Sequence, residues 1–232
     1  MNIYGLFIMI GVFAGTFLYF RLLKKFDLPT DDLWKNICII FFVGLIGARA
    51  TYIILYPEQF SSFYEVVAIW QGGLVSYGGI LAGILAALLE FRGRYLVLKL
   101  NLLAPSFFVG WIFGRIGGFV TQNAVGILNN SFGPIFYSRV PIQLFESLLS
   151  LVIVILSVIL IFKLDRKFIL RYPIILIASL GDYTLGRFII DFWREDPKVF
   201  LGLQFGQLIS FFIFFCCIIM LLYIFRSRKK IS

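Results

Sequence analysis

Long apolar stretches separated by short polar segments dominate the pattern of this 232-residue chain. An α-helix needs roughly 20 apolar residues to cross the hydrocarbon core of a bilayer, which is about 30 Å thick. About seven stretches approach or reach that length, and they predict an all-α integral membrane protein whose residues 1–232 form a single polytopic transmembrane domain. The predicted spans are Ile3–Leu22, Asn36–Tyr56, Leu74–Phe91, Leu100–Phe119, Gln143–Phe162, Phe168–Ile190 and Phe205–Phe225.

The positive charges predict how these spans are oriented. Most of the 21 Lys and Arg residues lie after the first, third, fifth and seventh spans, which places them on one side of the membrane. Because cytoplasmic loops carry an excess of Lys and Arg, we expect the N-terminus outside and the C-terminus in the cytoplasm. The residues concerned are Arg21, Lys24, Lys25, Lys35, Arg92, Arg94, Lys99, Lys163, Arg166, Lys167, Arg171, Arg226, Arg228, Lys229 and Lys230.

Composition excludes several classes of function. The net charge of +9 is concentrated at the ends of spans and is not interleaved with aromatic residues on one face, as a nucleic-acid surface would require. The chain has no histidine, so a Ser-His-Asp triad and the commonest zinc sites are excluded. Its three cysteines lie in apolar stretches without the spacing of metal ligands. We therefore expect neither a metal nor an organic cofactor.

The remaining basic residues are not explained by orientation. Arg49, Arg115 and Arg187 lie in or at the end of apolar spans. A charged side chain there costs roughly 2.5–3.5 kcal/mol unless it is paired or hydrated. The outer segments Trp70–Gly73 and Gly114–Asn123 are rich in glycine, which predicts poorly helical backbone lining an outward-facing pocket. The basic residues in question are Arg49, Arg115, Arg139, Arg187, Arg194 and Lys198.

The sixth span ends in charged residues at helical spacing. Arg187, Asp191 and Arg194 would share one face if the helix continued that far, with the carboxylate between two guanidinium groups. This pattern fits either an ion pair that anchors the helix or an anion site. Arginine binds phosphate oxygens bidentately and stays charged when partly buried, so an anionic lipid is the expected ligand of such a site.

Motifs in a fixed order connect the chain to a known family. The motifs are Tyr4-Gly5, Gly47–Arg49 with Tyr52, Trp70–Leu74, Gly78-Gly79, Gly114–Gly117 with Phe119 and Gly126, Pro141–Glu146, Gly186–Phe188 through Arg194-Glu195, and Gly206–Ser210. Together they resemble the bacterial phosphatidylglycerol–prolipoprotein diacylglyceryl transferases through most of the sequence.

The resemblance implies an activity, its partners and its location. Members of the family transfer diacylglycerol from phosphatidylglycerol to the lipobox cysteine of a preprolipoprotein, the first step of lipoprotein maturation, in the bacterial inner membrane. By the same resemblance Arg115 and Arg187 are catalytic, and Tyr77 is a further candidate. Residues expected to bind substrate are Tyr4, Arg49, Gln71, Gly72, Gly73, Gly117, Gly126, Gln143, Glu146, Asp191, Arg194 and Glu195.

The chain also departs from the family pattern. Tyr77 stands where many members have a histidine, and Gly118, Thr121 and Asn123 replace polar residues of the signature motif. Two alternatives therefore stay open beside the transferase: a relative that donates the same lipid to another acceptor, and a non-catalytic protein that binds anionic lipid.

Overall fold

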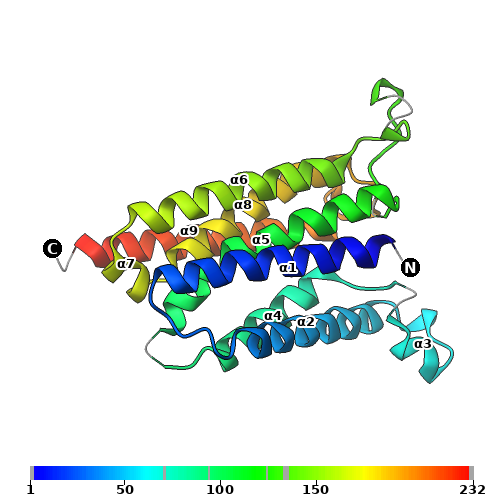
Figure 1. Ribbon diagram of the computed structural model, residues 1–232. Coiled ribbons are helices and arrows are strands. Elements are labelled where there is room, and N and C mark those ends of the chain that lie inside the picture. The colour runs from blue at the N-terminus through cyan, green and yellow to red at the C-terminus, as the bar shows by residue number, and fades with distance from the viewer. Residues whose placement is uncertain (1–2, 70–71, 94, 124, 133–135, 230–232) are drawn as a thin grey trace. The chain divides into compact units, whose positions relative to one another are not determined.

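The computed structural model describes residues 3–69, 72–93, 95–123, 125–132 and 136–229, and most of them are helical (Figure 1). The chain forms two compact units, each described here by itself: Met1–Leu22 with Val97–Ser232, and Leu23–Leu96. The single transmembrane domain stays a prediction. The long helices are α1 (Ile3–Lys25), α2 (Leu33–Leu55), α4 (Ser76–Glu90), α5 (Leu96–Val120), α6 (Ile142–Lys163), α8 (Ile174–Ile190) and α9 (Phe205–Lys229).

Short elements connect the long helices. They are η1 (Pro57–Gln59), α3 (Phe63–Val67), η3 (Asn130–Phe132), α7 (Arg166–Arg171), η5 (Asp191–Trp193), β1 (Lys198–Phe200) and β2 (Leu203–Gln204). The two strands pair antiparallel.

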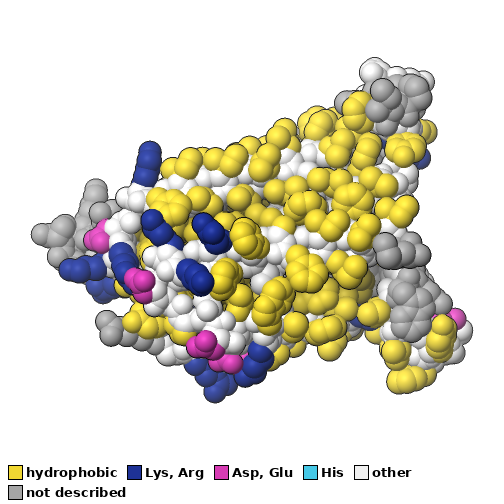
Figure 2. All heavy atoms as spheres, viewed as in Figure 1, with side chains coloured by type: hydrophobic (Ala, Val, Ile, Leu, Met, Phe, Trp, Pro, Cys, Tyr) yellow, Lys and Arg dark blue, Asp and Glu magenta, His cyan; other side chains and the backbone are white. Residues whose placement is uncertain are grey.

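The length and apolar composition of several helices among the described residues indicate a multi-pass membrane protein. Five of them, α1, α2, α5, α6 and α9, are long and apolar enough to cross a bilayer. Figure 2 shows hydrophobic side chains over much of the visible surface between the two ends of the molecule, as expected of helices that face lipid. Basic side chains gather near α7 and the C-terminal end of α9, which agrees with the charge pattern of the sequence (Figure 2).

Close contacts between small residues hold the second unit together. A Cβ added to Gly47 of α2 would lie 2.8 Å from the carbonyl oxygen of Gly78 in α4, and would overlap Ala82. A Cβ on Gly78 would overlap the side chain of Thr51. Lipid offers no hydrophobic driving force between helices, so dense packing of this kind is what associates them.

The first unit is a bundle of α1, α5, α6, α8 and α9 (Figure 1). Its α1 and α5 approach closely, because a Cβ on Gly11 would lie only 2.7 Å from the carbonyl oxygen of Gly110. Phe108 of α5, Ile153 of α6 and Tyr183 of α8 form a buried cluster. This cluster fixes the three helices that carry the charged residues discussed below.

The predicted continuous span Phe168–Ile190 is wrong, because the helix is broken at Pro173. Helix α7 ends at Arg171 and α8 begins at Ile174. Proline has no backbone N–H and disfavours helical geometry in the residue before it, so it starts α8 instead of continuing α7. As a result, α8 has 17 residues and is shorter than the predicted span.

Asn101 of α5 satisfies the backbone groups that this break exposes. Its Nδ2 donates to the carbonyl oxygens of Ile169 and Tyr172 at 2.8 and 2.9 Å. Its Oδ1 accepts from the backbone N–H groups of Ile175 and Leu176 at 3.0 and 3.3 Å. One fully buried side chain therefore fastens the end of α7 and the start of α8 to α5.

The expectation that Gly114–Asn123 is poorly helical is also wrong for most of its length. Helix α5 continues to Val120. Its glycines allow close packing within the bundle: a Cβ on Gly117 would lie 2.7 Å from the Cβ of Phe7 in α1. The gain from packing outweighs the intrinsic preference of glycine for irregular backbone.

We expect Asn101→Ala to destabilise the protein strongly, because it removes the hydrogen-bond partner of four backbone groups, two of them on the buried residues Ile169 and Ile175. Each lost partner costs roughly 1–3 kcal/mol. Thermal unfolding in detergent should show a clear fall in Tm, whereas Asn130→Ala, which changes an exposed asparagine, should leave Tm nearly unchanged. Equal Tm values for the two variants would contradict the role assigned to Asn101.

Candidate active site

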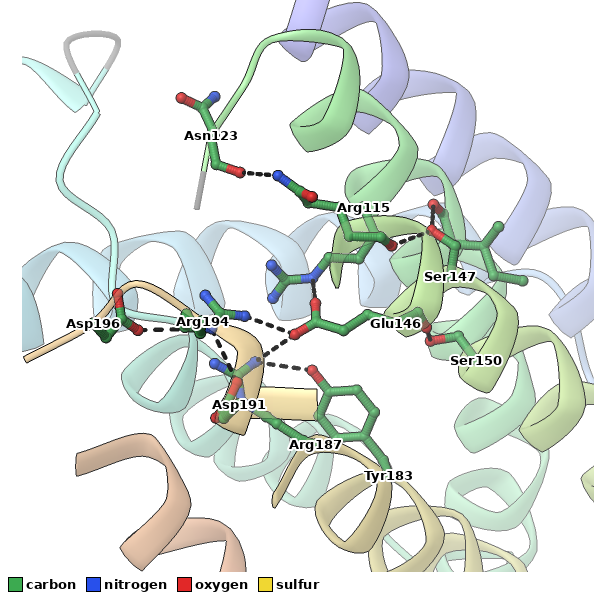
Figure 3. Close-up of polar contacts among 12 residues, drawn as sticks. Arg115, Asn123, Glu146, Ser147, Ser150, Tyr183, Arg187, Asp191, Arg194 and Asp196 are labelled. Atoms are coloured by element: carbon green, nitrogen blue, oxygen red, sulfur yellow. Dashed lines mark hydrogen bonds and ion pairs between the residues drawn. The ribbon is translucent and has the colours of Figure 1, made fainter. Parts of the chain in front are cut away.

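The centre of the candidate site is the carboxylate of Glu146, in the first turns of α6. Its side chain is completely buried and lies near guanidinium groups from three segments of the first unit (Figure 3). The Nε atom of Arg115, in α5, lies 2.6 Å from Oε2. From the other side, Nη2 of Arg194 and Nη1 of Arg187 lie 2.7 and 3.8 Å from Oε1. Membrane proteins seldom bury a carboxylate without such partners.

Asp191 is the second buried carboxylate of the cluster. Its two oxygens lie 3.5 Å from Nε of Arg187 and 2.9 Å from Nε of Arg194. The sequence spacing predicts that Asp191 lies between Arg187 and Arg194. The structure confirms this contact, but the three residues do not lie on one continuous helix. Helix α8 ends at Ile190, η5 follows, and Arg194 has extended backbone. The 3₁₀ turn brings Arg194 back towards Asp191 at a separation of three residues.

The charges of this cluster do not cancel. Arg115, Arg187 and Arg194 surround two buried carboxylates, while Asp196, 3.6 Å from Arg194, is largely exposed to solvent. The two buried guanidiniums, of Arg187 and Arg194, balance the two buried carboxylates, and the partly exposed Arg115 adds one further positive group. Because such groups interact strongly where water is excluded, an excess of positive charge favours binding of an anion.

Two aromatic residues support the arginines and were missed by the sequence analysis. Trp111 lies under Arg115, with the guanidinium carbon 4.7 Å from the ring centroid. Tyr183 accepts a hydrogen bond from Nη1 of Arg187 at 3.1 Å, and its ring packs edge-on against Trp111. Each aromatic residue precedes its arginine by four positions in a helix, so i,i+4 spacing is the signal that could have found them.

Extended segments around the cluster pair with each other. The backbone of Gly126 forms an antiparallel bridge with Arg194, and the N–H of Ile127 donates to the carbonyl oxygen of Trp193 at 2.9 Å. Gly126 is buried, and a Cβ there would overlap the carbonyl oxygen of Val140. This position accepts only glycine, because the neighbouring backbone lies so close.

Further predicted residues border this part of the first unit. Glu195 is exposed and pairs with Arg139, which also donates to the carbonyl oxygen of Gly126 at 2.9 Å. Gln143 is buried and donates from Nε2 to the carbonyl oxygen of Asn123 at 2.9 Å. In the same unit, Tyr4 of α1 lies against Gly117 of α5.

The altered signature positions bond within their own segment. Thr121 donates from Oγ1 to the carbonyl oxygen of Gly117 at 2.9 Å, and Asn123 donates from Nδ2 to Oγ1 of Thr121 at 2.8 Å. Gly118 is buried, and a Cβ added there would be in van der Waals contact with the backbone oxygen of Asn123 and the side chain of Gln143. These contacts end α5 and shape the turn that follows.

Arg49 lies in the second unit and contacts backbone. Its guanidinium donates to the carbonyl oxygens of Val66 at 3.0 Å, Gly72 at 2.6 Å and Gly73 at 3.0 Å, and also to that of Glu65. Two of these acceptors belong to the short helix α3 and two to non-helical backbone, and such backbone groups need hydrogen-bond partners near a membrane. Arg49 thus fastens the connection between α2 and α4.

The same connection is stabilised locally at α3. Ser62 and Glu65 form a capping box, in which each side chain accepts from the backbone N–H of the other residue. Hydrogen bonds from the backbone and hydroxyl of Ser61 lower the pKa of the exposed Glu65 carboxyl. A negative charge is thereby kept on the first turn of α3.

The remaining candidates also belong to the second unit. Gly72 and Gly73 have positive φ angles of 93° and 73°, which explains why glycine occupies both positions. Tyr77 is half-buried in the first turn of α4. Gln71 lies outside the described residues. The structure brings Arg115, Glu146, Arg187, Asp191 and Arg194 together in the first unit. Arg49 and Tyr77 belong to the second unit.

Comparison with known proteins decides the family. A family model described as prolipoprotein diacylglyceryl transferase matches residues 1–223. The chain belongs to this family. A phosphatidylglycerol–prolipoprotein diacylglyceryl transferase of Streptococcus uberis is 30% identical, over 98% of this chain and 91% of the relative. The protein of the same name in Streptococcus pneumoniae is 31% identical, over 98% of this chain and 90% of the relative. Family membership confirms the resemblance inferred from the sequence.

Glu146→Gln tests whether this carboxylate holds the diacylglyceryl transferase cluster together. The change keeps the size of the side chain and leaves three guanidiniums facing one buried carboxylate, so we expect a loss of about 3–5 kcal/mol. Thermal unfolding in detergent would report it. Glu195→Gln, which disrupts an exposed pair, should cost no more than about 1 kcal/mol. Similar Tm values for both variants would show that Glu146 is not the centre of the cluster.

Proposed function

We propose that this protein transfers the diacylglyceryl group of phosphatidylglycerol to the lipobox cysteine thiol of preprolipoproteins. Relatives with this activity in their names align with 98% of the chain. The chemistry of the arginine cluster supports the same reaction, because the donor lipid carries a phosphate and its departing group is an anion. Interactions that strengthen as this negative charge develops lower the barrier.

The observation that carries this proposal is the orientation of Arg115. Among the described residues, Arg115 forms its ion pair, with Glu146, through Nε alone (Figure 3). Its guanidinium otherwise lies over the ring of Trp111. Its two terminal nitrogens are therefore available as donors, and 16% of the side chain is exposed. A guanidinium presented in this way can bind two phosphate oxygens, the geometry for which arginine is suited.

The reaction requires one bond to form and one to break. The sulfur of the lipobox cysteine attacks the glyceryl carbon next to the phosphate, and a C–S bond replaces the C–O bond. The thiol proton goes to a base, and glycerol phosphate leaves with the electron pair of the broken bond. Arg115 and Arg187 stabilise the negative charge on the departing phosphate, by the same principle as an oxyanion hole.

The other residues of the cluster position these two arginines. Glu146 orients all three guanidiniums, while Asp191 and Arg194 fix Arg187 from the side of η5. Glu195 and its partner Arg139 lie at the exposed edge, where they control access to the cluster. Tyr77 is our candidate for the base, in the position where many members have a histidine. Arg49 shapes the substrate-binding connection that contains Gly72 and Gly73.

We further propose seven crossings of the bacterial inner membrane, with the N-terminus outside and the C-terminus in the cytoplasm. The two shorter helices, α4 and α8, have 15 and 17 residues. At 1.5 Å per residue they reach about 22 and 26 Å, and flanking extended backbone completes each crossing. The basic residues near α7 and the end of α9 favour this orientation. Phosphatidylglycerol and the preprolipoprotein then reach the site from the membrane.

Neutralising either central arginine should slow the reaction strongly. We expect Arg115→Gln and Arg187→Gln each to lower kcat/KM at least about 100-fold, because a donor to the departing phosphate is lost. The assay combines purified protein, vesicles containing phosphatidylglycerol and a fluorescent lipobox peptide, and detects the lipidated peptide by its mobility. Arg171→Gln, at the end of α7, is the matched control and should retain full activity. Retained turnover in both central variants, with wild-type Tm, would refute their proposed role.

Tyr77→Phe tests the proposed base separately. If the phenol accepts the thiol proton, the variant should lose kcat while KM for phosphatidylglycerol stays the same, since no phosphate contact is removed. Raising the pH should partly restore its rate, because more of the peptide thiol is then ionised. A wild-type kcat and pH profile would exclude Tyr77 as the base.

A further inference from the structure

The hairpin formed by β1 and β2 has an unusual residue in its turn. Phe200 pairs with Leu203, so the connecting turn consists of Leu201 and Gly202. Both have positive φ, 48° and 74° respectively. A two-residue turn with two positive φ angles belongs to the type I′ class, whose first position favours Asn, Asp or Gly. Leucine in this backbone conformation is strained.

The side chain of Leu201 is also unfavourably placed for a protein in water. It is 82% exposed, and its neighbours Val199 and Phe200 are 64% and 60% exposed. The tip of the hairpin thus exposes three consecutive apolar side chains. No described part of the first unit covers them. An exposed leucine in a strained backbone conformation is unfavourable in water. It is favourable only where its side chain meets apolar surroundings.

The position of the hairpin identifies these surroundings. Strand β2 ends at Gln204 and α9 starts at Phe205, with no residue between them. Both strands lie against the start of α9, which is one of the five membrane-spanning helices. The exposed side chains of Phe205, Phe211 and Phe212 continue the apolar surface along α9. At the other end of the hairpin, Lys198 is exposed and can reach the headgroups.

We propose that the apolar tip, Val199–Leu201, inserts into the interfacial region of the lipid bilayer at the end of the bundle that holds the arginine cluster. Its partner is the bilayer itself, at the boundary between headgroups and acyl chains. The continuity of the tip with the lipid-facing surface of α9 selects this partner over a water-soluble protein. Interfacial segments characteristically combine aromatic and aliphatic side chains with nearby Lys or Arg.

Insertion of the tip would set the depth of the active site. Nε2 of Gln204 donates to the carbonyl oxygen of Arg194 at 2.9 Å, and Gln207 of α9 accepts from the backbone N–H of Gln204 at 3.0 Å. Arg194 in turn contacts Glu146. The hairpin is therefore connected by short bonds to the cluster, and an anchored tip holds the guanidiniums near the lipid phosphates. This consequence rests on the proposed function.

A fluorescence measurement tests insertion without requiring turnover. Leu201→Cys, in full-length protein whose other cysteines are replaced, is labelled with an environment-sensitive dye and placed in phosphatidylglycerol-containing vesicles. We expect blue-shifted emission that is quenched by lipids with a nitroxide near the headgroup and poorly quenched by aqueous iodide. Strong quenching by iodide alone would overturn the proposal. So would a blue shift that requires addition of lipobox peptide, because the tip would then bind the peptide.

Leu201→Asn provides a matched variant that is expected to fold. Asparagine suits the type I′ turn better than leucine but removes the apolar anchor. In the vesicle assay we expect a severalfold higher KM for phosphatidylglycerol with unchanged kcat, and a Tm equal to or above that of wild type because the turn is less strained. Leu201→Met, which keeps an apolar side chain, should keep the wild-type KM. An unchanged KM in Leu201→Asn would refute the link between the tip and the site. If wild-type protein made no lipidated peptide, the proposed function would fail, while the quenching result would still decide insertion.

Discussion

A fully buried carboxylate is the constraint on which the functional half of the bundle depends. Glu146 is tolerated inside a membrane protein only because Arg115, Arg187 and Arg194 surround it, and each of these guanidiniums depends on the carboxylate in the same way. The four side chains come from α5, α6, α8 and the segment after η5. Their mutual attraction therefore determines how these elements meet, as well as what kind of ligand the site accepts.

Much of this arrangement can be predicted from the sequence. The apolar periodicity locates the membrane helices, and the spacing of Arg187, Asp191 and Arg194 predicts a carboxylate between two arginines. The sequence does not predict that Glu146 is the centre, because its partners are distant in the chain. It also misleads at Gly114–Asn123, where the packing of α5 against α1 outweighs glycine's preference for irregular backbone. Tertiary contacts decide both cases.

Arginines of similar sequence context have different tasks in this protein. Arg49 and Arg115 both interrupt apolar stretches, yet Arg49 binds backbone carbonyls of its own unit and Arg115 pairs with a carboxylate. The difference follows from what each side chain finds nearby: an irregular connection between two helices, or a buried acid. Residue type and membrane depth alone could not have separated the structural arginine from the catalytic candidate.

The way in which Arg115 meets Glu146 has a consequence for the end of the reaction cycle. Because this contact uses Nε, an anion bound by the two terminal nitrogens need not displace it. In the proposed reaction, a departing product would leave Arg115 still paired with Glu146, and only the single excess positive charge of the cluster would be left for the next phosphate. The empty site can keep its shape for the next lipid, and turnover need not wait for the arginines to rearrange.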